Sequence, residues 1–496
     1  MSESIVTNKS YGYNSAKIWQ IALFALNNTA TNLYLFTLTF VSYYATGVAG
    51  LTVVVISTIL TFMRVFDGIT DPIIGFIIDK TESKFGKFRP IMIIGNIIIA
   101  GSILTMYNVT HQLPEEFQMI FFIAAYAVYI IGYTMQTAVT KAGQTVLTNH
   151  PKQRPLFSIF DSVYNIGVFT GGQIFVASYL IAKHGDFNMA LFTELNTIVM
   201  IAAGVFTVLA TIAIWNKDRK EYFGLADLTV NTRFRDYLPI FKANRPLQML
   251  VIAASTDKVA SLVMRQAPVM VMFFGIMLGD YALSGTISLI TIVPGLIITF
   301  LGVMYARKSG MKNTLVKASW LGVISFGILI PFFLIIDPSI ISLESMGGIT
   351  IVFLILFSIG TGIGTLTPSI VIPMIADVSD YETFKTGRYV PGMIGTIFSF
   401  IDKMVSSLAP ALVGFLVAII GYKNEFPQLG ETLTTPLLIM TLIIAFGIPI
   451  LGWLISIIAM KFYILDKKKM NEIQSAIADE KQKSEEEEDE DEAMVW

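Results

Sequence analysis

Twelve long apolar segments follow one another along the sequence, and they limit what this chain can fold into. A helix that spans a bilayer needs about 20 mostly apolar residues, and 54% of the 496 residues are hydrophobic while 14% are charged. The segments predict an all-α polytopic membrane protein with little chain left for a soluble domain. The expected helices cover 18–45, 51–78, 90–108, 118–148, 156–182, 191–215, 247–276, 282–305, 314–336, 347–375, 390–422 and 436–464.

The loops between these segments indicate how the chain is oriented. Lys and Arg collect in alternate loops, including 79–89 and 216–246, whereas the opposite set holds only Lys183 and Lys423. Basic loops stay in the cytoplasm. We therefore expect a multi-pass protein of the cell membrane with both termini in the cytoplasm.

The long connection 216–246 divides the segments into two sets of six. This predicts an N-terminal six-helix bundle over 1–215, a cytoplasmic central loop over 216–246, a C-terminal six-helix bundle over 247–464 and a cytoplasmic acidic tail over 465–496. Two such bundles suit a transporter that works by alternating access. The tail is too short for a phosphotransferase-like domain, and its run of Glu and Asp is typical of a solvated segment.

Ionisable residues inside the apolar segments are functional candidates, because a charge at bilayer depth is costly. Arg64, Asp67 and Asp71 share one face of the expected helix 51–78, since residues three and four apart are neighbours on a helix. Two stacked carboxylates with Thr70 beside them can hold Na⁺ or share a proton. An ion pair between Arg64 and Asp67 is the structural alternative, and it leaves Asp71 unexplained.

Other expected helices carry further polar side chains. A candidate network of interior charges consists of Arg64, Lys141, Asp161, Asp402 and Lys403. Asp257, Lys258 and Arg265 either join this network or lie near a membrane interface. The candidate substrate-binding side chains are Asn28, Thr31, Asn32, Gln136, Thr137, Thr140, Lys141, Asp161 and Asn165. Those of the first helix, Asn28, Thr31 and Asn32, suit the hydroxyl groups of a ligand, and contacts between helices are their alternative role.

Several segments carry a family resemblance. GFIIDKTESKFGKFRP at 75–90 resembles the loop signature of the major facilitator superfamily, although a merely basic loop is the alternative. Residues 63–90, YYATGVAGLT at 43–52 and ADVSDYETFKTGR at 376–388 are similar to the glycoside-pentoside-hexuronide:cation symporter family. The candidate gating residues of the first loop are Gly75, Asp79, Gly86, Lys87 and Arg89.

Such a resemblance implies a fold of two six-helix bundles and the symport of a sugar, glycoside or sugar acid with a cation. It also implies a bacterial inner membrane protein. By the resemblance, Asp67, Asp71 and Thr70 form the cation site, Arg64 supports it, and Lys403 ties its own helix to the carboxylates.

One departure from the family bears on the coupling ion. Melibiose permease-like members carry a further Asp where this chain has Gln136 or Thr137, and Lys141 adds a cation about one turn later. A site with fewer carboxylates and an added ammonium group compensates Na⁺ less well. The pattern therefore favours H⁺ over Na⁺.

Other classes of function are less consistent with the residues. The alternative substrate is a non-sugar solute such as a lysolipid or an organic anion. An enzyme is not expected, since the three histidines lie near loops or helix ends and the sequence has no HExxH or GxSxG motif. We expect no cofactor, no metal beyond a possible Na⁺, and no nucleic-acid partner. The expected partners are the small-molecule substrate, the coupling cation and the lipid bilayer.

Overall fold

The structure is a computed structural model that describes residues 14–81, 83–148, 153–219, 237–387, 391–477 and 479. Within these ranges the chain forms helices and no strands, which confirms the all-α class. Eleven of the described helices are long and apolar enough to cross a membrane. The expected first span corresponds to α1 (Ile18–Leu38), which is not among the eleven because Asn27, Asn28 and Asn32 lower its hydropathy.

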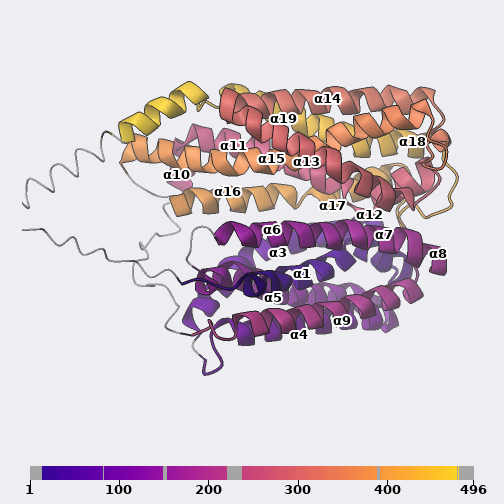
Figure 1. Cartoon of the computed structure of the whole chain (residues 1–496). Coiled ribbons are helices and arrows are strands. Elements are labelled where there is room, and N and C mark those ends of the chain that lie inside the picture. The colour runs from indigo at the N-terminus through magenta and orange to yellow at the C-terminus, as the bar shows by residue number, and fades with distance from the viewer. Residues whose placement is uncertain are drawn as a thin grey trace, which may run out of the picture. The chain divides into compact units, whose positions relative to one another are not determined.

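The first of two compact units contains Met1–Val41, Ile69–Gln173 and Asn188–Thr229. Its long helices besides α1 are α4 (Phe88–Val109), α5 (Glu115–Leu147), α6 (Arg154–Ile166) and α9 (Met189–Ile214). Helix α1 packs against α9, α6 and α5, and α4 packs against α5 and α9 (Figure 1). Phe24 and Phe157 meet edge to face in the apolar core of this unit.

The second unit contains Ser42–Gly68, Ile174–Phe187 and Val230–Trp496. Its long helices are α11 (Arg245–Met264), α13 (Leu283–Ser309), α14 (Met311–Ile335), α15 (Gly348–Thr386), α16 (Pro391–Ser406), α17 (Ala409–Ile419) and α19 (Ile448–Phe462). Helix α15 packs against α13 and α14, and α11 packs against α19 and α16. A short helix at 467–477 follows and places Met470 and Ile473 in the core of this unit.

Helix α3 (Val53–Lys80) begins in the second unit and ends in the first. The segments 42–68 and 174–187 group with the C-terminal helices, so the two units do not follow a simple division at the central loop. Most of that loop, and the acidic run of the tail, lie outside the described residues. The expected boundaries of the two bundles, the central loop and the tail stay a prediction.

Wide π-helical turns interrupt three of the expected helices, and such turns are frequent at functional sites. After α6 the chain continues through η3 (Gly167–Gly171), α7 (Gly172–Ile174), η4 (Phe175–Leu180) and α8 (Ile181–His184). After α11 it continues through α12 (Ala267–Met270) and η8 (Val271–Met277), and the last span is α18 (Thr435–Leu442), η10 (Ile443–Gly447) and α19. The remaining short elements are α2 (Val41–Tyr43), η1 (Tyr44–Val48), η2 (Thr110–Gln112), α10 (Tyr237–Ala243) and η9 (Pro338–Ile340).

Two expected helix ends differ from the structure for identifiable reasons. The expected helix 390–422 is divided into α16 and α17, because Pro410 lacks a backbone N–H and begins a new helix. The expected helix 347–375 continues to Thr386, where Gly387 adopts a φ of 69° and ends it. Residues 376–386 leave the apolar pattern without leaving the helix, so hydropathy alone placed this end too early.

Candidate functional site

The acidic residues of α3 lie one turn apart on the same helix. Asp67 is 8% exposed and Thr70 is also buried, while Asp71 is half-buried. The Lys403 Nζ atom on α16 lies 3.3 Å from the Asp67 Oδ2 atom, and the two residues are 336 positions apart in the chain. Asp67 therefore has a cationic partner within the second unit.

Arg64 does not take that role. Its side chain is exposed, and it forms no ion pair with any residue that the structure describes. The structure therefore contradicts the alternative of an Arg64–Asp67 ion pair. Lys403 of α16 pairs with the Asp67 carboxylate instead.

A second ion pair joins α16 to α11. The Lys258 ammonium contacts the Asp402 carboxylate. Asp402 and Lys403 are consecutive, so their side chains point in different directions from α16 and reach different helices. One helix thus forms ion pairs with α3 and with α11 inside the second unit, which a list of charged residues could not reveal.

Replacing Lys403 with Ala is expected to lower both stability and coupling, because the Asp67 carboxylate then stays buried without its cation. Lys403 is about one-third exposed, so we expect a loss of about 1–3 kcal/mol in the free energy of unfolding, below that of a fully buried pair. Thermal unfolding in detergent and uptake into vesicles measure the two effects. Lys461→Ala, at an exposed position of α19, is the matched control. Equal unfolding curves for the two variants would contradict the assignment.

Several hydroxyl and amide side chains of α1, α3 and α5 form hydrogen bonds between helices. The Thr70 and Thr134 hydroxyl groups lie 3.1 Å apart. Asn27 donates to the Thr140 hydroxyl at 2.8 Å and to the backbone oxygen of Gln136. The Gln136 amide in turn donates to the carbonyl of residue 92 in α4 at 2.5 Å. Gln136 and Thr140 therefore form hydrogen bonds between helices, and their expected contacts with a substrate stay a prediction.

Other members of the expected substrate set remain half-buried between α1 and α6. Asn32 donates to the Asn165 side-chain oxygen at 2.6 Å, and Asn28 donates to the Asp161 carboxylate at 3.4 Å. The structure thus brings four of the expected residues together in the first unit, with carboxylate and amide groups on neighbouring helices. Thr31 is buried and donates to a carbonyl of its own helix, and Thr137 does the same on α5.

Lys141 lies apart from these groups. Its side chain on α5 is exposed and takes part in no ion pair among the described residues. The structure therefore does not bring Lys141 to Asp161, and its role in the charge network stays a prediction.

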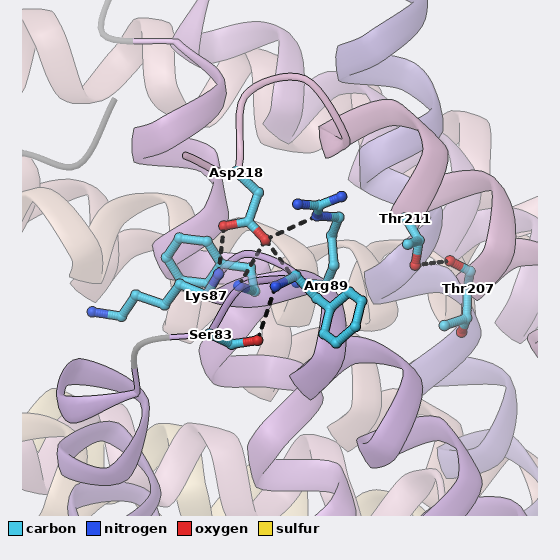
Figure 2. A network of polar contacts seen from close by, with 8 residues as sticks. Ser83, Lys87, Arg89, Thr207, Thr211 and Asp218 are labelled. Atoms are coloured by element: carbon cyan, nitrogen blue, oxygen red, sulfur yellow. Dashed lines mark hydrogen bonds and ion pairs between the residues drawn. The ribbon is translucent and has the colours of Figure 1, made fainter. Parts of the chain in front are cut away.

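A site that sequence reasoning missed lies at the start of α4. The Asp218 carboxylate, just after α9, accepts hydrogen bonds from the backbone N–H groups of Lys87, Phe88 and Arg89 at 2.9, 3.0 and 3.0 Å. Its Oδ2 atom also lies 3.3 Å from the Arg89 Nε atom. Figure 2 shows the carboxylate turned toward this turn of backbone. An anion at a helix N-terminus meets unpaired N–H groups and the positive end of the helix dipole.

The residues around Asp218 fit the carboxylate closely. Gly86 has a φ of 95°, and a Cβ atom there would lie 2.1 Å from the Asp218 Oδ2 atom. The Arg89 guanidinium stacks over the Trp215 ring at 4.4 Å. Of the expected gating residues, Gly86, Lys87 and Arg89 therefore meet at one place, while the Asp79 side chain lies outside the described side chains and Gly75 has open space around it. Asp218 is an acidic residue within the basic run NKDRK, which is the signal that could have found it.

The second unit has a further cluster at the start of α3. The Tyr43 hydroxyl donates to the Pro427 carbonyl at 2.7 Å, and the Tyr43 ring stacks on Phe187 with a centroid distance of 4.6 Å. Phe187 also meets Tyr281 edge to face. We call Tyr43, Phe187, Tyr281 and Phe426 the aromatic cluster. It holds segments 42–68 and 174–187 against the C-terminal helices.

The close approach of α17 to α3 within the second unit gives a testable prediction. A Cβ atom at Gly414 of α17 would lie 1.9 Å from the Ser57 hydroxyl of α3. Gly414→Val is expected to destabilise this packing by about 1–3 kcal/mol, which shifts the equilibrium between packed and separated α3 and α17 about 5-fold to 150-fold toward the separated state. Because the chain has no cysteine, Thr46→Cys provides a unique thiol. Adding Gly414→Val to Thr46→Cys should increase the rate at which maleimide labels this thiol. Gly327→Val, where nothing lies within 4 Å, should leave the labelling rate unchanged.

The multiple spanning helices, the ion pairs between helices and the polar residues on neighbouring helices define a multi-pass membrane transporter of solutes. Residues 23–467 match the MFS/sugar transport protein family. The chain belongs to this family, and it is a transporter and not an enzyme.

Relatives of known description support the same class. A glucuronide carrier protein homolog of Escherichia coli is 24% identical over 451 residues, which cover 89% of this chain and 91% of that protein. The isoprimeverose transporter of Lactiplantibacillus pentosus is 23% identical over 470 residues, covering 92% and 91%. A putative glycoside/cation symporter of Escherichia coli is 24% identical over 436 residues, covering 84% and 83%.

Solved structures share the fold. The nucleoside transporter NupG superposes with a TM-score of 0.61 at 12% identity, covering 90% of this chain and 99% of that chain. The D-xylose-proton symporter superposes with a TM-score of 0.54 at 13% identity, covering 88% and 95%. The expected major facilitator fold is thereby confirmed.

Proposed function

We propose that this protein imports a sugar, glycoside or sugar acid in symport with a cation, and that H⁺ is the coupling ion in preference to Na⁺. The observation that carries the proposal is the ion pair between Lys403 and Asp67, one turn from Asp71 on α3. Bound Na⁺ needs several oxygen ligands and uncompensated negative charge, in the manner of other hard cations. The ammonium group already compensates one of the two acids, whereas a proton needs only one carboxylate oxygen.

The proposed substrate follows from the polar residues shared by α1 and α6. Asn28, Asn32, Asp161 and Asn165 provide both donors and acceptors at half-buried positions. Pockets with a few placed polar groups on apolar walls suit small ligands, and hydroxyl-rich ligands need both kinds of hydrogen bond. The names of the relatives, a glucuronide carrier homolog and an isoprimeverose transporter, support a sugar or sugar acid.

In the proposed cycle, cation and sugar bind from outside and are released to the cytoplasm as the two helical bundles rock. Both termini lie in the cytoplasm of a bacterium, as the basic loops favour. The aromatic cluster then belongs to the outer side, and the Asp218 contact with the start of α4 belongs to the cytoplasmic side.

Uptake of a radiolabelled glycoside panel into proteoliposomes tests the proposal, with uronides and sulfonated sugars included. An imposed H⁺ gradient and an imposed Na⁺ gradient are compared in parallel. We expect accumulation with the H⁺ gradient alone. Accumulation that requires Na⁺ would overturn the choice of ion, and no accumulation of any sugar would overturn the substrate class in favour of a non-sugar solute.

A further inference from the structure

Asp257 on α11 is a buried acid that the ion pairs described above do not use. The residue is 7% exposed, and both of its carboxylate oxygens are fully buried without a hydrogen-bond partner among the described residues. A carboxylate in an apolar interior is strongly disfavoured unless it is paired or hydrogen-bonded. The buried group therefore needs either a cation or a proton.

The available cations are engaged elsewhere or out of contact. Lys258, the next residue, points away from Asp257 and contacts Asp402, and Lys403 pairs with Asp67. The helices packed against α11 are α10, α12, α15, α16, α17 and α19, together with the turn η10. The titratable and charged residues of these elements and of α11 itself, among the described side chains, are Lys242, Arg245, Lys258, Asp377, Asp380, Tyr381, Glu382, Lys385, Asp402, Lys403 and Lys461. Within the described part of the chain, none of them forms an ion pair or a hydrogen bond with the Asp257 carboxylate.

Hydroxyl groups, in contrast, are close by. Ser456 on α19 lies beside Asp257, is completely buried, and its hydroxyl group forms no hydrogen bond of ordinary geometry among the described residues. Helices α11 and α19 approach closely here, since a Cβ atom at Gly452 would lie 3.0 Å from the Thr256 carbonyl oxygen. Asp257 therefore lies where α11 packs closely against α19, next to the uncharged hydroxyl group of Ser456.

We propose that Asp257 is a proton-binding site within the C-terminal helices, distinct from the carboxylates of α3. When a proton binds, one O–H bond forms on a carboxylate oxygen and the charge changes from −1 to 0. The resulting acid is neutral, and its O–H group can donate to the Ser456 hydroxyl oxygen. Proton binding thus removes the uncompensated charge and offers the two unpartnered groups a hydrogen bond. That Asp257 takes part in coupling together with the acids of α3 rests on the proposed function, whereas the presence of a proton on Asp257 does not.

Infrared spectroscopy of the protein in lipid vesicles tests whether Asp257 carries a proton, and the measurement needs no substrate. The wild type is expected to show the carbonyl band of a protonated carboxylic acid at neutral pH, and Asp257→Asn is expected to lack that contribution. Asp280→Asn, at an exposed loop position, is the matched control and should retain it. An identical band in wild type and Asp257→Asn would overturn the proposal, as would loss of the band on addition of Na⁺ at constant pH.

Two further measurements keep the outcome decisive. If Asp257→Asn does not insert, Ser456→Ala retains the acid and removes the neighbouring hydroxyl. A shifted carbonyl band then supports the site, and an unshifted band overturns it.

In transport, Asp257→Asn is expected to keep sugar counterflow and lose proton-driven accumulation. Absence of all sugar transport in the wild type would contradict the proposed function, while the infrared result would still decide whether Asp257 binds a proton.

Discussion

Asp71→Asn and Asp67→Asn are each expected to abolish concentrative uptake while the protein still inserts into the membrane. The two acids lie one turn apart on α3, and the amide that replaces either of them cannot bind a coupling proton. One charge that moves through about 100 mV is worth about 2.3 kcal/mol, enough for about 50-fold accumulation. Uptake by either variant should reach only the external concentration, measured in energised vesicles.

The structure also predicts that these two variants differ in stability. Asp67→Asn removes the carboxylate that pairs with Lys403, whereas Asp71→Asn leaves that pair intact. Asp67→Asn should therefore unfold at the lower temperature, and adding Lys403→Ala should restore stability without restoring accumulation, because neighbouring substitutions are not additive. Asp466→Asn, at an exposed position, is the control. Full accumulation by both single variants would remove the α3 acids from the mechanism.

Asp218→Ala is expected to have the second large effect, because this carboxylate accepts from three consecutive backbone N–H groups and from Arg89. Its loss leaves the start of α4 without an acceptor. We expect a decrease of about 2–4 kcal/mol in the free energy of unfolding, together with a lower rate of sugar uptake. Thermal unfolding in detergent and initial uptake rates measure the two consequences, and Asp218→Asn should show an intermediate effect.

Gly86, in the loop before α4, and Gly75, near the end of α3, form a pair of variants for this prediction. Gly86→Ala adds a Cβ atom that collides with the Asp218 carboxylate at a backbone φ of 95°, whereas Gly75→Ala adds one in open space. We expect Gly86→Ala to reproduce the loss seen in Asp218→Ala and Gly75→Ala to behave like the wild type. Equal stability of the two glycine variants would contradict the proposed role of the contact.

Local sequence patterns could predict the spans but not all of their ends. Apolar runs locate helices such as α9 because burial in lipid requires about 20 apolar residues. Hydropathy does not report helix formation itself, so the polar end of α15 up to Thr386 was not predicted. Hydropathy also predicted one helix over 390–422, which Pro410 divides into α16 and α17. The acids of α3 were found because they lie within one helix at neighbouring positions.

The sequence by itself determined the class of this protein: a multi-pass helical transporter with two acids and Thr70 on α3. The tertiary structure alone decided which charges meet. Among the described residues, Asp67 pairs with Lys403 and not with Arg64, Lys258 pairs with Asp402, and the Asp257 carboxylate accepts no hydrogen bond of ordinary geometry. The physical reason is that spans follow from local hydropathy, whereas an ion pair between residues 336 positions apart depends on how helices pack and on the direction of each side chain.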